Sequence, residues 1–167
     1  MSLVILLCTA CSHKYRVDSL STPEKLIPVN SHYYVMMAAD GHFGGTQYVG
    51  SGVMVTDAVS MVLQQHQGGV TKATSLETLE QALERANTQN IEYVFRPLIV
   101  HWEDRATEWS GRPDRITMRY TIFDAKTGKE IASTLESASS KWGTFGGDHP
   151  QDLAPQTVED FINSVSG

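Results

Sequence analysis

Hydrophobic and polar residues follow two alternating periods along this chain, which predict a mixture of strands and helices. A nearly continuous apolar run over residues 33–39 ends at Asp40, as is typical of a strand buried on both faces. We therefore expect a central strand there. Ser51 is a suitable cap for a helix that ends before Gly68, because apolar residues then recur every three or four positions. These residues are Val55, Val59, Val62 and Leu63.

The next segment predicts a second strand and a second helix. Residues 70–73 are expected to form a short strand. Residues 74–77 read Thr-Ser-Leu-Glu, which matches the capping-box pattern, so we expect the second helix to open there and to close near residues 87–90. Its apolar face is predicted to consist of Leu76, Leu79, Leu83 and Ala86.

The second half of the chain predicts an antiparallel meander and a final helix. Residues 91–100 are rich in β-branched and aromatic side chains, residues 116–124 alternate apolar and polar positions, and residues 130–137 follow a turn-like segment. The last helix is expected to begin at Ala154 or Gln156, with Val158, Phe161, Ile162 and Val165 as its buried stripe. The order β-α-β-α-β-β-β-α predicts an α/β (α+β) fold, a mixed sheet with helices packed against it.

Size and charge narrow the class of protein. With 167 residues the chain is expected to hold one domain, and it contains no stretch of eighteen or more apolar residues. Its formal net charge is −6, and no basic run occurs. A nucleic-acid binder needs clustered lysines and arginines, so this class is excluded, and a surface that adheres to anionic lipid is disfavoured.

The N-terminus has the features of a lipoprotein signal. The apolar run from Leu3 to Leu7 is too short to span a bilayer and suits a signal peptide. The following residues 7–12, Leu-Cys-Thr-Ala-Cys-Ser, resemble the bacterial lipobox, in which diacylglycerol is attached to the cysteine before cleavage. Cys11 is therefore the expected lipid attachment site. Cys8 in place of the usual leucine, and the lack of Lys or Arg before Cys11, leave open an ordinary apolar segment with two free thiols.

These features predict three parts: a signal peptide (1–10), a lipidated tether (11–31) and a single periplasmic domain (32–167). The tether is expected because the segment is polar, contains two prolines and has no sustained period. Ser12 stands where an aspartate would signal retention in the inner membrane, so the outer membrane is favoured. Without a thiol in the mature domain, neither a disulfide nor a cysteine nucleophile is expected.

Several residue patterns resemble parts of catalytic or ligand-binding sites. Gly50 and Gly52 do not follow a strand directly and lack the third glycine of a dinucleotide-binding loop, so we interpret them as part of a helix start. Strand alternation would place His101 and Glu103 on one face, where Asp148 and His149 could complete a metal site or a pocket. No nucleophile motif is present, so we expect neither an enzyme nor a cofactor or metal.

Two longer segments carry a resemblance to a known family. They are residues 101–115, HWEDRATEWSGRPDR, and residues 145–153, FGGDHPQDL. Together with the stretch from Ala39 to Thr46, they resemble the proteobacterial lipoproteins grouped as domain of unknown function 4823. The order of elements is also similar to that of accessory domains such as the curli-secretion lipoprotein and the lipoprotein activators of penicillin-binding proteins. The resemblance implies a small lipoprotein that works through a protein-binding surface.

The sequence therefore predicts a lipid-anchored accessory domain that binds another cell-envelope protein. We expect the binding surface in two loops, 102–115 and 142–153, since tryptophan and arginine are common at interface hot spots. The candidate binding residues are Trp102, Glu103, Asp104, Arg105, Trp109, Arg112, Trp142, Asp148 and His149. The alternative is a periplasmic protein that binds a small molecule or glycan, or a hydrolase, with its site near His101, Glu103, Asp148 and His149.

Overall fold

A computed structural model describes residues 13–66, 68–104, 113–140 and 149–167. The strands are β1 (Lys14–Ser21), β2 (Tyr33–Val35), β3 (Gly41–Phe43), β4 (Thr46–Tyr48), β5 (Val70–Lys72), β6 (Tyr93–Glu103), β7 (Arg115–Asp124) and β8 (Glu130–Ser139). The helices are α1 (Ser51–His66), α2 (Leu79–Thr88) and α3 (Pro150–Val165). None of the helices in the described residues combines the length and apolar character needed to cross a membrane.

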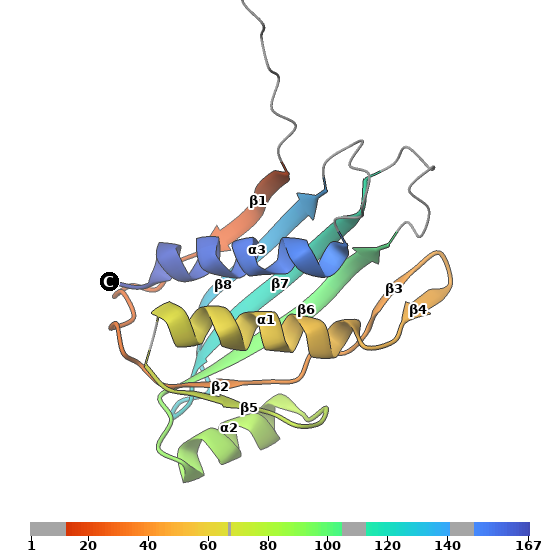
Figure 1. Ribbon diagram of the computed structural model, residues 1–167. Helices are drawn as coiled ribbons and strands as arrows, with labels where there is room; N and C mark the ends of the chain where they lie inside the picture. The colour runs from red at the N-terminus through yellow and green to blue at the C-terminus, as the bar shows by residue number, and fades with distance from the viewer. Residues whose placement is uncertain (1–12, 67, 105–112, 141–148) are drawn as a thin grey trace, which may run out of the picture.

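Six strands form one mixed sheet in the order β1-β8-β7-β6-β2-β5, and β3 and β4 form a separate hairpin. β1, β8, β7 and β6 are antiparallel neighbours, whereas β2 runs parallel to both β6 and β5. Helices α1 and α3 lie side by side across one face of the sheet, and α2 lies beside the β2 and β5 edge (Figure 1). The predicted fold class is confirmed, and the eight expected elements occur in the expected order.

Each face of the sheet buries its own apolar cluster. Under α1 and α3 lie the alternating residues of β7, and the predicted stripes of both helices pack against them. On the opposite face, α2 covers only one corner, where Ala82 and Ala86 contact a cluster that includes Tyr34, Val94 and Phe123. The rest of that face, over β6, β7, β8 and β1, has no helix across it in the described part of the chain.

The edge strand β1 lies inside the expected tether of residues 11–31, where no hydrophobic period predicts a strand. Lys14–Ser21 pairs along its length with β8, and Ile27 is buried against the end of α3, where its backbone amide donates to the carbonyl of Val165. Most β1 side chains are exposed, so the strand shows no apolar alternation. Its stability comes from backbone pairing with a distant segment. The division into signal peptide, tether and domain stays a prediction.

Other boundaries also differ from expectation. The apolar run at 33–39 is a strand only as far as Val35, although this strand does lie between two neighbours. The expected opening of α2 at 74–77 is wrong, because the capping box is formed by Thr78 and Gln81 and Leu76 is 65% exposed. Helix α3 begins earlier than expected, at Pro150, where the fixed φ of proline suits the first helical position.

Candidate functional site

One end of the sheet gathers most of the residues that the sequence singled out. The strand register pairs Lys14 with Ser139, Ser139 with Arg115, and Arg115 with Glu103, so the start of β1 lies in one row with the end of β6. Strands β6 and β8 end at this row, β7 begins at it, and α3 begins at the same end of the sheet (Figure 1). We call it the loop end, defined by Lys14, Glu103, Arg115, Ser139 and His149.

Trp102 and Glu103 occupy different faces from those that strict alternation predicts. An irregularity of register lies between Ile99 and His101, and after it Trp102 pairs with Ile116. Trp102 therefore points into the core beneath the helices and is 2% exposed. Its ring is not presented at the surface, so the expected binding role is replaced by a core role. Glu103 lies on the other face and is also buried, at 3% exposure.

The hairpin formed by β3 and β4 holds the end of β6. The ring of Phe43 stacks edge to face on His101, with ring centroids 4.8 Å apart, and Nε2 of His101 lies 3.4 Å from a carboxylate oxygen of Glu103. The hydroxyl of Tyr48 donates to the carbonyl oxygen of Asp104 at 3.4 Å. His101 and Glu103 do share a face, as expected. Phe43 and Tyr48 are contacts that the sequence analysis missed.

His149 is the residue before the first turn of α3, and its backbone amide donates to the Asp152 carboxylate at 3.0 Å. This geometry is that of a helix cap. Arg105, Trp109, Arg112, Trp142 and Asp148 lie outside the described residues, as does Cys11. Within the described residues, no group of three or more His, Cys, Asp or Glu side chains is arranged to hold a metal ion.

The start of α1 is built around Asp40. Its carboxylate accepts the backbone amides of Gly50 and Gly52, at 3.1 and 2.9 Å. Ser51, the expected cap, instead donates to the carbonyl of Tyr48. A Cβ at Gly52 would stand 2.2 Å from the carbonyl oxygen of Ala38, so glycine is required for helix packing. The Gly-Ser-Gly segment therefore serves the helix start, as interpreted, and Asp40 already occupies its anion-binding amides.

Asp40→Ala is expected to lower the free energy of unfolding by about 1–2 kcal/mol, because two helix amides lose their acceptor. Asp40→Asn is the matched control, since its amide oxygen can still accept these bonds, and it should lose less than half as much. Urea unfolding followed by circular dichroism measures both variants. Equal losses would show that the negative charge, rather than the acceptor, stabilises the helix start.

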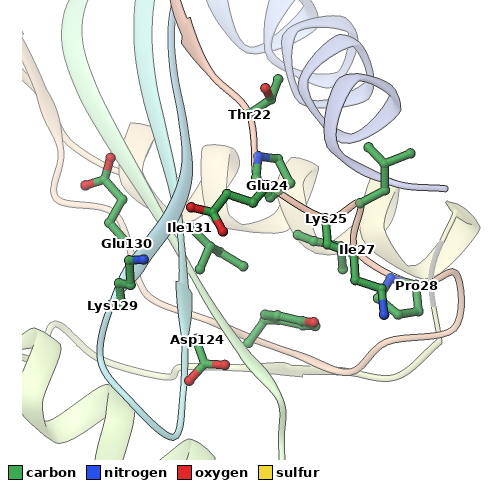
Figure 2. A pocket seen from close by; sticks show the side chains of 12 residues that line it. Thr22, Glu24, Lys25, Ile27, Pro28, Asp124, Lys129, Glu130 and Ile131 are labelled. Carbon is green, nitrogen blue, oxygen red and sulfur yellow. The ribbon is translucent and has the colours of Figure 1, made fainter.

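A separate cavity of about 440 Å³ lies away from the loop end. It is bounded by the segment 22–28 on one side and by the hairpin of β7 and β8 on the other (Figure 2). Charged residues of both signs line it, including Glu24, Lys25 and Lys129. Asp124 also lines the cavity, but its carboxylate accepts hydrogen bonds from Thr127 in the hairpin turn. His101, Glu103 and His149 do not line this cavity, so the alternative pocket gains no support from it.

Comparison with known proteins identifies a family and a shared fold. The family model described as domain of unknown function (DUF4823) matches residues 24–165. No curated protein sequence matches the chain. Among solved structures, the dodecamer of a single-substitution variant of PelC from Paraburkholderia phytofirmans is similar at a TM-score of 0.66 and 14% identity, covering 92% of this chain and 99% of that chain.

Two further structures show the same fold. Protein XCC0632 from Xanthomonas campestris, of family DUF330, matches at a TM-score of 0.54 and 11% identity, covering 84% of this chain and 87% of its own. Lipoprotein GNA1162 from Neisseria meningitidis matches at a TM-score of 0.50 and 14% identity, covering 80% and 96%. The fold is therefore one that bacterial lipoproteins use, and at these identities the likeness establishes the fold alone.

Proposed function

This chain belongs to the DUF4823 family, and from that premise we propose that it is a lipid-anchored, non-enzymatic accessory protein of the bacterial cell envelope. We further propose that it faces the periplasm from the outer membrane and binds another envelope protein through its loop end. The fold that it shares with bacterial lipoproteins, among them GNA1162, supports this class. The same fold occurs in the PelC dodecamer, so it is compatible with extensive contacts between proteins.

The observation that carries the proposal is the place of the N-terminus on the sheet. β1 begins at Lys14, only three residues after the proposed attachment site Cys11. Three extended residues reach at most about 10 Å, so an acyl anchor would hold the start of β1 close to the lipid surface. Because Lys14 shares its row with Ser139, Arg115 and Glu103, the whole loop end would face the membrane.

This arrangement specifies the kind of partner. A protein that meets the loop end must itself lie at the membrane surface, so we propose an integral or anchored envelope protein as the partner. The binding residues would come from the two loops, namely Arg105, Trp109, Arg112, Trp142 and Asp148, together with the partly exposed Asp104 and the exposed His149. The cavity beside Lys129 would point away from the membrane.

Attachment at Cys11 is tested with the full-length chain in a bacterial host. We expect the wild type to incorporate palmitate label and to be recovered in the membrane fraction. Cys11→Ser should do neither, because no other cysteine remains once the signal peptide is removed. Cys8→Ser is the matched control and should keep the label. Label that persists in Cys11→Ser would contradict the assignment.

Partner binding is tested by site-specific photo-crosslinking in the same cells. A photoreactive amino acid at Asp104, at the loop end, is expected to form an adduct with a membrane-fraction protein, and the adduct should disappear in Cys11→Ser. The same amino acid at Lys129, exposed near the opposite end of the sheet, is the control and should form no such adduct. Adducts at Lys129 but not at Asp104 would overturn the proposed orientation.

A further inference from the structure

The sheet face opposite α1 and α3 carries several positively charged side chains that are not clustered in the sequence. We call it the open face, and it extends over β1, β8, β7 and β6 beyond the corner that α2 covers. The cationic residues on it are Lys14, Arg16, Arg96, Arg115 and Arg119. The acidic residues there are Asp18, which pairs with Arg16, Glu103, which is buried, and the exposed Glu130, which stands opposite Phe123 at the far end of β8.

The centre of the open face combines these cations with exposed apolar residues. Arg119 is exposed and is flanked in register by Leu98 on β6 and Leu135 on β8. Leu98 and Val100 are 44% and 52% exposed. Within the described part of the chain, neither Arg115 nor Arg119 takes part in an ion pair. The open face thus offers a partner both guanidinium groups and the exposed apolar side chains of Leu98 and Val100.

The opposite side of the molecule has complementary chemistry. Helices α1 and α3 contain no lysine or arginine, and their carboxylates are Asp57, Asp152, Glu159 and Asp160. A neighbouring cation, Lys72 of β5, already pairs with Asp57. The outward ridge of α1 carries three apolar residues, Val53, Met54 and Met61, each between 46% and 49% exposed, beside the exposed Asp57, Gln64 and Gln65. Methionine side chains adapt readily to a partner surface.

We propose that a second copy of this chain is the partner of the open face. The open face of one copy would pack on the α1 ridge of the next, with Leu98 and Val100 against the exposed Val and Met side chains and the arginines toward the carboxylates of α1 and α3. The two surfaces lie on opposite sides of the molecule (Figure 1), so the contact is head-to-tail rather than twofold. A heterologous contact of this kind builds rings or filaments. This inference goes beyond the proposed function and does not depend on the lipid anchor.

Disulfide trapping between single-cysteine variants tests the geometry. The background is the full-length chain with Cys8→Ser and Cys11→Ser, which has no other thiol. Leu98→Cys mixed with Met61→Cys should give a crosslinked dimer, and neither variant alone should do so. Leu98→Cys mixed with Leu76→Cys is the control, because Leu76 is 65% exposed but lies on neither surface. A dimer formed by Leu98→Cys alone, or no dimer in the mixture, overturns the head-to-tail contact.

Sedimentation velocity tests the role of charge in the same background. Arg119→Glu is expected to weaken self-association at least tenfold in Kd, while Lys126→Glu, the same charge change in the exposed hairpin turn, should leave it unchanged. Raising the salt concentration should weaken association of the parent chain. A parent chain that stays monomeric at about 100 µM in low salt overturns the proposal. So does Arg119-dependent binding to phosphatidylglycerol vesicles by a chain that does not self-associate, since lipid would then be the partner of the open face.

Discussion

Trp102→Ala is expected to lower the free energy of unfolding by about 3–5 kcal/mol, the usual range for an aromatic side chain removed from a packed core. The ring is 2% exposed and belongs to the cluster beneath α1 and α3. It also closes the contact between β6 and the β3–β4 hairpin, where a Cβ at Gly41 would stand 2.5 Å from that of Trp102. The substitution therefore loses buried area and loosens the hairpin at once.

Leu76→Ala is the control for this prediction, because it removes an apolar side chain that is 65% exposed and lies on neither surface of the proposed contact between copies. It should change the free energy of unfolding by less than about 1 kcal/mol. Guanidinium unfolding of both variants, followed by circular dichroism, gives the comparison. A loss below about 1 kcal/mol for Trp102→Ala would mean that the ring is not held in the core, and its expected role in partner binding would regain support.

The helices and central strands could be predicted where burial imposes a period on the sequence. The stripe of Val55, Val59, Val62 and Leu63 in α1 is fully confirmed, because one helix face meets the sheet for its entire length. The start of α2 could not be predicted this way. Both Thr74 and Thr78 are followed three residues later by Glu or Gln, so local chemistry permits either cap. The packing of Ala82 and Ala86 on the sheet selects the second.

The candidate site shows where strand alternation stops being informative. A strict period of two would place Trp102 and Ile99 on opposite faces, but the irregularity before His101 shifts the phase and brings both onto the covered face. Nothing in the local sequence marks this shift. The edge strand β1 was missed for a related reason, since its partner β8 lies more than 100 residues away and its exposed side chains carry no pattern.

A second large effect is expected from a buried carboxyl under α3, that of Glu136. This residue of β8 is 2% exposed, and the hydroxyl of Thr134 donates to it at 3.2 Å. Burial raises the pKa of Glu136 from 4.5 to about 7, and the nearby carboxylate of Asp160 adds to the rise, whereas the Thr134 bond lowers it. Within the described residues, no ion pair compensates the charged form.

The sign of the pH effect follows from proton binding. Between pH 4.5 and 7 the unfolded chain has lost this proton while the folded chain keeps it, so folding becomes less favourable as the pH rises. At about 1.4 kcal/mol per pH unit, the wild type should lose about 3 kcal/mol across this range from this group alone. Glu136→Gln keeps the size of the side chain and an acceptor for Thr134 but does not titrate. The free energy of unfolding of Glu136→Gln should therefore not show this decrease between pH 4.5 and 7.

Urea unfolding of wild type and Glu136→Gln at pH 5, 6, 7 and 8 measures the effect. The two proteins should be within about 1 kcal/mol of each other at pH 5, and the variant should be more stable by about 2–3 kcal/mol at pH 8. Glu130→Gln makes the same chemical change at an exposed position of the same strand, so its difference from wild type should not vary with pH. A difference between wild type and Glu136→Gln that stays constant from pH 5 to 8 would show that Glu136 is charged throughout. The helix α3 would then have to leave that carboxylate in contact with water.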